Sequence, residues 1–297
     1  MSNVSHRYIS VIFATALVAC GRDTPPPVTI TPEPTRTSIP PPVAEVFPTF
    51  APTPLTGSEE ERTPVAALTY DGVWRDVKPG LQAMLLRARV GKRDELVVLV
   101  RVDPAQHTIR VLYDPVQPRL VREWFDATQA DAVINAGFFL DDRTTAGLLI
   151  ASGQVFGASY KGFGGMFAMR GATPSVQWLR TQPYQPDASM THAVQAAPML
   201  VQNGRVVQGV TDNGERNRRS FVAVDRQGRV LLGVSQTAAW SLTDLATFLA
   251  RTPQLEIDDA LNLDGGASSG LWVRSSIDPA LTNSFDVVPS VIVVGGA

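Results

Sequence analysis

The stretch that decides the fold runs from Leu261 to Gly270 and reads LNLDGGASSG. An apolar strand delivers Asp264 at its end, and the two glycines that follow let the backbone turn tightly and approach a ligand closely. Ser268 and Ser269 come next, and their hydroxyls, together with the amides of the loop, can bind an oxyanion. A plain Asp-Gly hairpin turn would explain the aspartate and one glycine, but it explains the two serines less well. The loop therefore predicts a ligand site between two strands.

Two further segments place a side-chain amide beside an apolar strand. The segment INAGFF at 134–139 ends a buried strand in Asn135, whose amide can face a cleft. A turn-forming Asn-x-Gly with both phenylalanines in the core is the competing interpretation, and the pattern alone favours it. The segment QAAPMLV at 195–201 begins with Gln195, which means little by itself, and precedes the hairpin signal Asn203-Gly204.

A pair of arginines precedes another apolar strand. The segment NRRS at 217–220 leads directly into the apolar run FVAV. An arginine at the mouth of a strand offers a rigid fork of donors that suits phosphate or carboxylate. A solvated basic turn is the commoner explanation for any single arginine, so this segment is a candidate anion site that needs support from elsewhere in the chain.

Short apolar runs with turn residues between them fill the chain from about Ala66 onward. Two segments have helical spacing, Leu120–Ala130 and Ser241–Arg251, and the second begins with a Ser cap and an Asp three positions later. The β-branched runs predict strands at Leu96–Val102, Thr108–Tyr113, Ala132–Asn135, Gly165–Met169, Met199–Gln202, Phe221–Val224, Val230–Val234, Ala260–Leu263, Gly270–Val273 and Val291–Val294. Strands outnumber helices without regular alternation, which predicts a single α+β domain with a mixed, mostly antiparallel twisted sheet and a few packed helices.

Composition excludes several kinds of function. The formal net charge is -2 and charged residues make up 18% of the chain, so a nucleic-acid partner is not expected. Cys20 is the only cysteine, and His107 and His192 are the only histidines after it. The chain beyond Cys20 therefore cannot form disulfides, use a cysteine nucleophile, or build a thiolate or multi-histidine metal site.

The N-terminus reads as an export signal followed by a spacer. Residues 1–20 combine a short basic segment, the apolar run YISVIFATALV and the sequence LVAC, which resembles a bacterial lipobox. An ordinary signal peptide that happens to end near a cysteine is the alternative. We expect lipid on Cys20, with the protein exported and anchored to the bacterial cell membrane. Residues 21–65 are rich in Pro and Thr and predict a disordered stalk, which leaves 66–297 as the domain.

Taken together, the motifs resemble those of the phosphodiester glycosidase family. The resemblance covers roughly residues 90–297 and follows the family's order of landmarks, which are NAGFF at 135–139, QAAPML at 195–200, RRSFVAVD at 218–225, SLTDLATFL at 241–249 and NLDGGASSG at 262–270. The last is the most specific, because the family shows a closely similar Leu-Asp-Gly-Gly-x-Ser-Ser. The sequence departs from the family pattern at four positions that could reshape the pocket, namely Ala197, Phe221, Ala267 and Gly270.

The resemblance implies hydrolysis of a sugar-1-phosphodiester, in a glycan or cell-envelope polymer, at the anomeric carbon–oxygen bond. A phosphodiester leaves as a stable monoester anion, so one carboxylate can suffice where ordinary glycosidases use two. The implied catalytic residues are Asp264 as base or nucleophile, Arg219 on the leaving phosphate and Asn135 on sugar or phosphate. The implied substrate-binding residues are Gln195, Gly265, Gly266, Ser268 and Ser269. No cofactor is expected, although aspartates could bind a divalent cation without a recognisable calcium loop.

Two other classes of function fit parts of the sequence. The same pocket could belong to a surface module that binds a glycan without cleaving it, but such a module would be free to lose Asp264, which is present. A Ser-His-Asp hydrolase would have to use His107 or His192, neither of which lies in a matching motif, and the sequence has no nucleophile elbow.

The lipobox gives a direct prediction. The acyl chain that anchors a lipoprotein is attached to its cysteine, and the chain's methylenes supply the membrane affinity. Cys20→Ala removes the attachment site, so it should abolish labelling of the protein by a fatty-acid probe in a bacterial host. The unchanged chain, expressed and labelled in parallel, is the control. Labelling that persists in the variant would remove the lipoprotein assignment.

Overall fold

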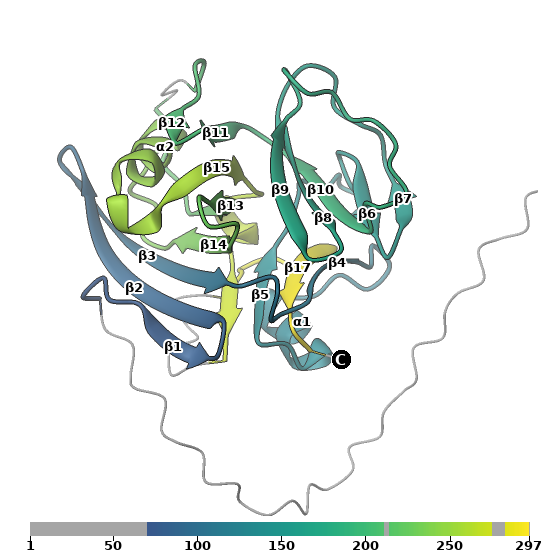
Figure 1. The fold of residues 1–297 in the computed structure, drawn as a ribbon, viewed down its shortest axis with the longest axis horizontal. Helices are drawn as coiled ribbons and strands as arrows, with labels where there is room; N and C mark the ends of the chain where they lie inside the picture. Colours follow the sequence, from purple (N-terminus) through teal and green to yellow (C-terminus); the bar gives the residue numbers. More distant parts are fainter. Residues whose placement is uncertain (1–69, 211–213, 275–282, 297) are drawn as a thin grey trace, which may run out of the picture. The chain divides into compact units, whose positions relative to one another are not determined.

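The computed structural model describes residues 70–210, 214–274 and 283–296. The predicted signal peptide, the predicted lipidation site at Cys20 and the predicted stalk all lie outside these residues. Three antiparallel sheets and two α-helices make up the described part of the chain (Figure 1). Within it, no helix is both long enough and apolar enough to span a lipid bilayer.

The largest sheet has eight strands in the order β1-β2-β3-β14-β13-β15-β11-β12. Its strands are β1 Arg75–Lys78, β2 Leu81–Val90, β3 Arg93–Val102, β11 Met199–Gln202, β12 Arg205–Val206, β13 Arg219–Asp225, β14 Val230–Ser235 and β15 Ile257–Asn262. The order brings β13 and β15 side by side, with Phe221 opposite Asn262. Because the two strands are antiparallel, the first residues of β13 and the last residues of β15 lie at the same end of the sheet.

Two smaller sheets complete the fold. The five-stranded sheet has the order β7-β6-β10-β8-β9, with β6 Leu149–Ala151, β7 Gln154–Phe156, β8 Gly165–Arg170, β9 Thr173–Trp178 and β10 His192–Ala196. The four-stranded sheet has the order β16-β5-β17-β4, with β4 Ile109–Tyr113, β5 Ala132–Asn135, β16 Leu271–Val273 and β17 Ser290–Val294.

All three sheets contribute to one central core. Its fully buried side chains include Val98 and Leu261 from the eight-stranded sheet, Phe167 from the five-stranded sheet, and Ile134 and Ile292 from the four-stranded sheet. A buried residue of this size stabilises the fold by about 1.5–3 kcal/mol relative to an exposed one. The shared core therefore fixes the positions of the three sheets relative to one another.

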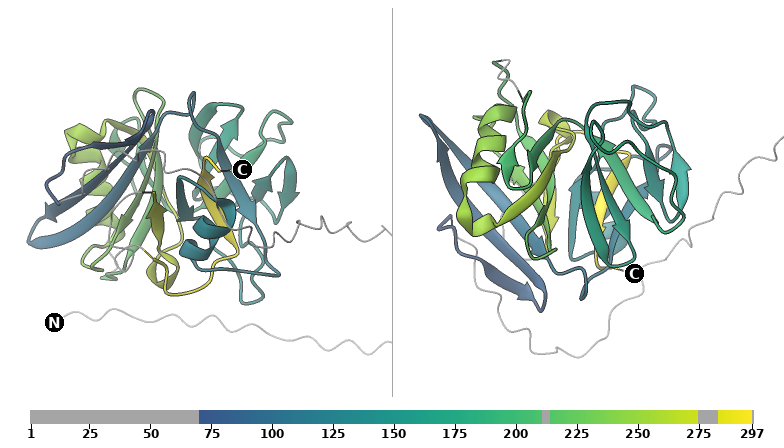
Figure 2. Two further views of the ribbon diagram at one scale, coloured as in Figure 1. Left: turned by 90° about the horizontal axis from the view of Figure 1, so that it is seen from below. Right: turned by 45° about the horizontal axis from the view of Figure 1, so that its top comes forward.

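Each helix covers the outer face of a different sheet (Figure 2). The helix α1, Val121–Thr128, packs on the four-stranded sheet, and α2, Leu242–Arg251, packs on the eight-stranded sheet. The capping box expected at the start of α2 is present, because the Asp244 amide donates to the Ser241 hydroxyl and the Ser241 amide donates to the Asp244 carboxylate. Two short 3-10 helices, Pro253–Leu255 and Gly266–Ser268, precede and follow β15.

The sequence predicted the mostly antiparallel character and the two helices, but not all of the strands. The structure divides the predicted single sheet into three, and within the described residues every named pairing is antiparallel. The strand β2 was missed because its sequence, LQAMLLRARV, is rich in residues that favour helices. Its ten-residue pairing with β3 overrides that local preference, since tertiary context outweighs propensity.

Candidate active site

The loop after β15 carries the chain from the eight-stranded sheet into the four-stranded sheet. Backbone hydrogen bonds fix its path against the start of β13, because the Leu263 amide donates to the Ser220 carbonyl at 2.8 Å and the Gly266 amide donates to the Arg218 carbonyl at 2.9 Å. Gly266 has a φ of 62°, a conformation that glycine adopts without strain. The loop that carries Asp264 therefore runs along the segment that contains Arg218, just before β13, and Arg219, the first residue of β13.

Asn135 joins the pieces of this site. Its side-chain nitrogen donates to the Asp264 carbonyl at 2.7 Å, and its side-chain oxygen accepts from the Ser220 hydroxyl at 2.7 Å and from the Gly270 amide at 3.1 Å. The side chain has no exposed surface. The expectation that this amide contacts sugar or phosphate is corrected here, because the structure turns it into the protein, where it positions the loop.

The Asp264 side chain is half-buried, and the Gly265 amide donates to its Oδ1 at 2.8 Å. Burial raises the pKa of Asp264 above its ordinary value, and repulsion from Asp286 raises it further. Hydrogen bonding from the Ser268 side chain and from the Gly265 amide lowers the same pKa, in opposition. A carboxyl group with this balance holds its proton at higher pH than an exposed aspartate does, which suits a group that exchanges protons during a reaction.

Both arginines are nearly buried, with 7% of each residue exposed. Arg219 Nε and Arg218 Nη1 have no hydrogen-bond partner within the described residues. Arg219 Nη2 makes one long contact, 3.4 Å, with the Glu215 carbonyl, whereas Arg218 Nη2 donates to the Asn283 carbonyl at 3.0 Å. Burial lowers the pKa of both guanidinium groups, although arginine stays charged in proteins. Buried donors that lack a partner are costly, and an anion would satisfy them.

The two arginines differ in their surroundings. A Cβ added to Gly265 would lie 3.9 Å from Arg219 Nη1, so this guanidinium flanks the loop at the residue after Asp264. The Arg218 guanidinium lies over the Phe285 ring, 4.4 Å from its centroid, and Phe285 is 71% exposed. The Phe285 amide in turn donates to the Ala267 carbonyl at 2.7 Å. The two arginines therefore lie at different parts of the same loop. Arg219 is near Gly265, and Arg218 is linked to Ala267 through Phe285.

Gln195 lies in β10 and stabilises a neighbouring loop. Its side-chain oxygen accepts from the Tyr160 amide at 2.8 Å, and its nitrogen donates to the Ser159 hydroxyl at 2.8 Å. Only 1% of Gln195 is exposed. The predicted contact between Gln195 and substrate is therefore corrected, because the amide is used to fix the loop that carries Tyr160. Burial raises the pKa of Tyr160, and repulsion from the Asp264 carboxylate raises it further, which places this loop near that carboxyl.

The predicted serines and glycines divide into two groups. Gly265 and Ser268 contact the Asp264 carboxyl, and the Gly266 amide donates to the Arg218 carbonyl; their contact with substrate stays a prediction. Ser269 is fully buried and its hydroxyl has no hydrogen-bond partner within the described residues. The predicted contact between Ser269 and substrate is a further correction, since the side chain points into the interior just before β16.

Three residues of the site were not predicted from the sequence. Ser220 donates to Asn135, Asp286 adds a repulsion that raises the pKa of Asp264, and Tyr160 lies near the same carboxyl in the loop between β7 and β8. The run SYKGFGG at 159–165 could have signalled the Tyr160 loop, because its glycines Gly162 and Gly164 adopt positive φ angles. No comparable signal marks Asp286.

The described residues contain no group of three or more His, Asp or Glu side chains arranged to hold a metal ion. His192 Nδ1 instead lies 3.2 Å from the Val111 amide and 3.3 Å from the Ser152 amide. Binding of a divalent cation by aspartates of the site stays a prediction from the sequence.

Comparison with known proteins places the chain in a family. The model of the phosphodiester glycosidase family matches residues 128–295, which is more than half of the 297 residues. The chain belongs to the phosphodiester glycosidase family, whose members act on phosphodiester-linked carbohydrates. A search of curated proteins found no significant match.

Two solved structures share the fold. The catalytic domain of the zebrafish N-acetylglucosamine-1-phosphodiester alpha-N-acetylglucosaminidase, auto-inhibited by its pro-peptide, is 16% identical and superposes with a TM-score of 0.62 over 78% of this chain and 87% of that one. A hypothetical protein from Synechocystis is 17% identical, with a TM-score of 0.56 over 75% of this chain and 63% of that one. At these identities the likeness concerns the fold.

The surroundings of Asp264 predict two opposite pKa changes. Asp286→Asn removes a repelling charge and should lower the pKa of Asp264, whereas Ser268→Ala removes a hydrogen-bond donor and should raise it. Carbon-13 NMR of labelled aspartate measures both, with the Asp264 signal assigned from its loss in Asp264→Asn. Shifts of the same sign in the two variants, or none in either, would contradict the described surroundings.

Proposed function

We propose that this protein is an exported, lipid-anchored enzyme that hydrolyses sugar-1-phosphodiester bonds of glycans or cell-envelope polymers. The observation that carries the proposal is that the loop with the raised-pKa carboxyl of Asp264 is hydrogen-bonded through its backbone to the Arg218–Ser220 segment, whose two buried guanidinium groups have unpaired donors. The first group can act on the sugar side of the bond, and the others can bind the phosphate side. Membership of the phosphodiester glycosidase family supports the same chemistry.

Asp264 is the proposed proton acceptor or nucleophile. In the base mechanism, the Asp264 carboxylate takes a proton from water as the water oxygen bonds to the anomeric carbon. The bond from that carbon to the phosphate oxygen breaks, and its electron pair leaves with the phosphate monoester. In the nucleophile mechanism, the carboxylate itself bonds to the carbon, and water then hydrolyses the glycosyl ester. The raised pKa makes the Asp264 carboxylate a stronger base than an exposed aspartate, which suits the first mechanism.

Arg219 is the proposed group that binds the leaving phosphate. Hydrogen bonds between a guanidinium and a phosphate are charge-assisted, and a planar fork can make two of them at once. The monoester anion is more negative than the diester, so the attraction grows as the bond breaks, which is the condition for catalysis. Arg218 has a free buried donor as well and can share the charge.

Asn135, Gln195 and Ser268 are proposed to act through other groups. Asn135 holds the Asp264 backbone, Gln195 holds the Tyr160 loop, and Ser268 tunes the pKa of Asp264. Rigid placement of this kind contributes to catalysis because a small displacement of the reacting groups is expensive. The Gly265 and Gly266 backbone leaves room for a ligand to approach the loop, since neither residue has a side chain.

The location of the proposed reaction follows from the N-terminal sequence. The apolar run Tyr8–Val18 and the lipobox that ends at Cys20 support export and lipid attachment. The Pro/Thr-rich segment at 21–65 would then hold the enzyme away from the membrane surface as a semi-rigid spacer. Substrates at the cell envelope or on extracellular glycans are the ones such an anchor would reach.

The enzyme proposal predicts the effect of removing one charge. Asp264→Asn keeps the size of the side chain and should lower turnover of a panel of sugar-1-phosphodiesters by about 10²–10⁴-fold, as loss of a positioned acid or base does. Substrate affinity and the melting temperature should change little. Release of free sugar under single-turnover conditions and a melting curve on the same preparation measure these quantities.

Asp94→Asn is the matched control, because Asp94 forms an exposed ion pair with Arg89 on the β2–β3 hairpin and such pairs contribute little. Turnover within a few-fold of normal in a folded Asp264→Asn variant would contradict the catalytic role. Binding of the substrate panel without any turnover in the unchanged protein would favour the non-catalytic glycan-binding module.

A further inference from the structure

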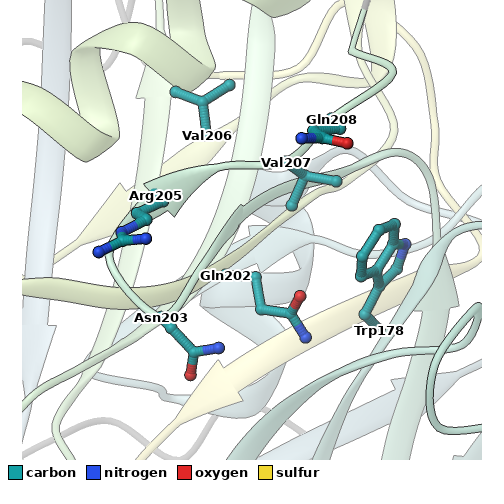
Figure 3. Close-up of a pocket in the computed structure, with 7 residues that line it drawn as sticks. All are labelled: Trp178, Gln202, Asn203, Arg205, Val206, Val207 and Gln208. Carbon is teal, nitrogen blue, oxygen red and sulfur yellow. The ribbon is translucent and has the colours of Figure 1, made fainter.

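A second concave site lies away from the Asp264 loop. A cavity of about 400 Å³ opens between the end of β9 and the β11–β12 hairpin, and Figure 3 shows the side chains that line it. None of them belongs to the site around Asp264. The volume falls within the range of roughly 300–1,000 Å³ that is typical of small-molecule sites.

The lining combines one aromatic ring with several unused polar groups. Trp178 supplies the ring, and the polar side chains are Gln202, Asn203, Arg205 and Gln208. These four side chains make no hydrogen bond or ion pair with any other residue that the structure describes. Three amides and one guanidinium are therefore available to a ligand, and no carboxylate belongs to the described part of the lining.

This combination of groups matches the chemistry of a sugar. A side-chain amide both donates and accepts hydrogen bonds, as each hydroxyl of a sugar does. An aromatic ring offers an apolar face for the carbon-bound hydrogens of a sugar ring, and its indole N–H remains polar. We propose that the Trp178 cavity is an accessory carbohydrate-binding site, which holds a sugar unit without cleaving it.

The charge of the cavity refines the ligand class. Among the described residues that line the cavity, Arg205 is the only charged one, and the Arg180 guanidinium lies 5.8 Å from the centroid of the Trp178 ring. These two cations favour a saccharide that carries an anionic group, such as a phosphate, over its neutral counterpart, since the neighbouring Asp259 carboxylate already accepts from the Asn203 amide. A metal ion or a cationic ligand does not fit these groups.

The cavity is held in place by the strands around it. The Gly204 amide donates to the Asp258 carbonyl at 2.7 Å, the Asn203 amide donates to Asp259 Oδ1 at 3.1 Å, and the Val207 amide donates to the Leu200 carbonyl at 3.0 Å. On the other side, the Leu179 amide donates to the Gly164 carbonyl at 3.2 Å. A site whose backbone is already ordered loses less entropy when a ligand binds.

The test follows the indole signal of Trp178 in the full chain. Nitrogen-15 NMR resolves tryptophan indole groups, and Trp178→Phe identifies the Trp178 peak by its loss. The probes are chitotetraose, maltotetraose and glucose 1-phosphate, each at millimolar concentration. At least one probe should shift the Trp178 peak while the peak of Trp240, which is fully buried, stays in place.

Variants then separate this site from the proposed catalytic site. Trp178→Ala should weaken binding of the shifting probe about tenfold or more at the cavity, because it removes the stacking surface. Arg205→Ala should remove any preference for the phosphorylated probe over the neutral ones. Asp264→Asn should leave the Trp178 shift unchanged, so failure of the enzyme proposal would not affect this result.

Three outcomes would overturn the proposal. The first is that no probe shifts the Trp178 peak. The second is that Trp178→Ala binds the probes as tightly as the unchanged chain does. The third is that a tetrapeptide of Gly and Ser shifts the peak when the saccharides do not, which would indicate a peptide site. The melting curve of each variant shows that it is folded.

Discussion

The rest of the site depends on the hydrogen bonds of the Asn135 side chain. One amide group, buried at the end of β5, bonds to β13 through the Ser220 hydroxyl, to the loop after β15 through the Asp264 carbonyl, and to the residue before β16 through the Gly270 amide. It therefore links the eight-stranded and four-stranded sheets at the point where the chain crosses between them. Each buried group left unpaired by its loss would cost about 1–3 kcal/mol.

The site beside this link contains ionisable groups that are withdrawn from solvent and only partly hydrogen-bonded. The carboxyl of Asp264 is half-buried with a raised pKa, and the guanidinium groups of Arg218 and Arg219 are buried with unpaired donors. Burial of unpaired charge is destabilising, and proteins tolerate it chiefly where function requires it. A phosphodiester would complete both halves of the site, which is why the proposed reaction accounts for features that a purely structural loop does not.

The sequence predicts the parts of this account that depend on local pattern. The β-branched runs give β3, β13, β14 and β17, and the capping box gives α2, because these signals are short-range. The direction of the Asn135 side chain could not be predicted in the same way, since its partners Ser220 and Gly270 lie 85 and 135 positions away. Tertiary contacts likewise determine three other features. These are the burial of the Gln195 and Ser269 side chains, the strand conformation that β2 adopts despite its helix-favouring residues, and the proximity of Asp286 to Asp264.

Amide hydrogen exchange in Asn135→Ala tests the central claim most directly. Removal of the acceptor oxygen should accelerate exchange of the Gly270 amide by about tenfold or more, because this hydrogen bond protects it. The Leu232 amide in β14 serves as the reference for an intact fold and should exchange at its usual rate. If Gly270 stays as protected as in the unchanged chain while the fold is intact, Asn135 does not hold the loop and the account is wrong.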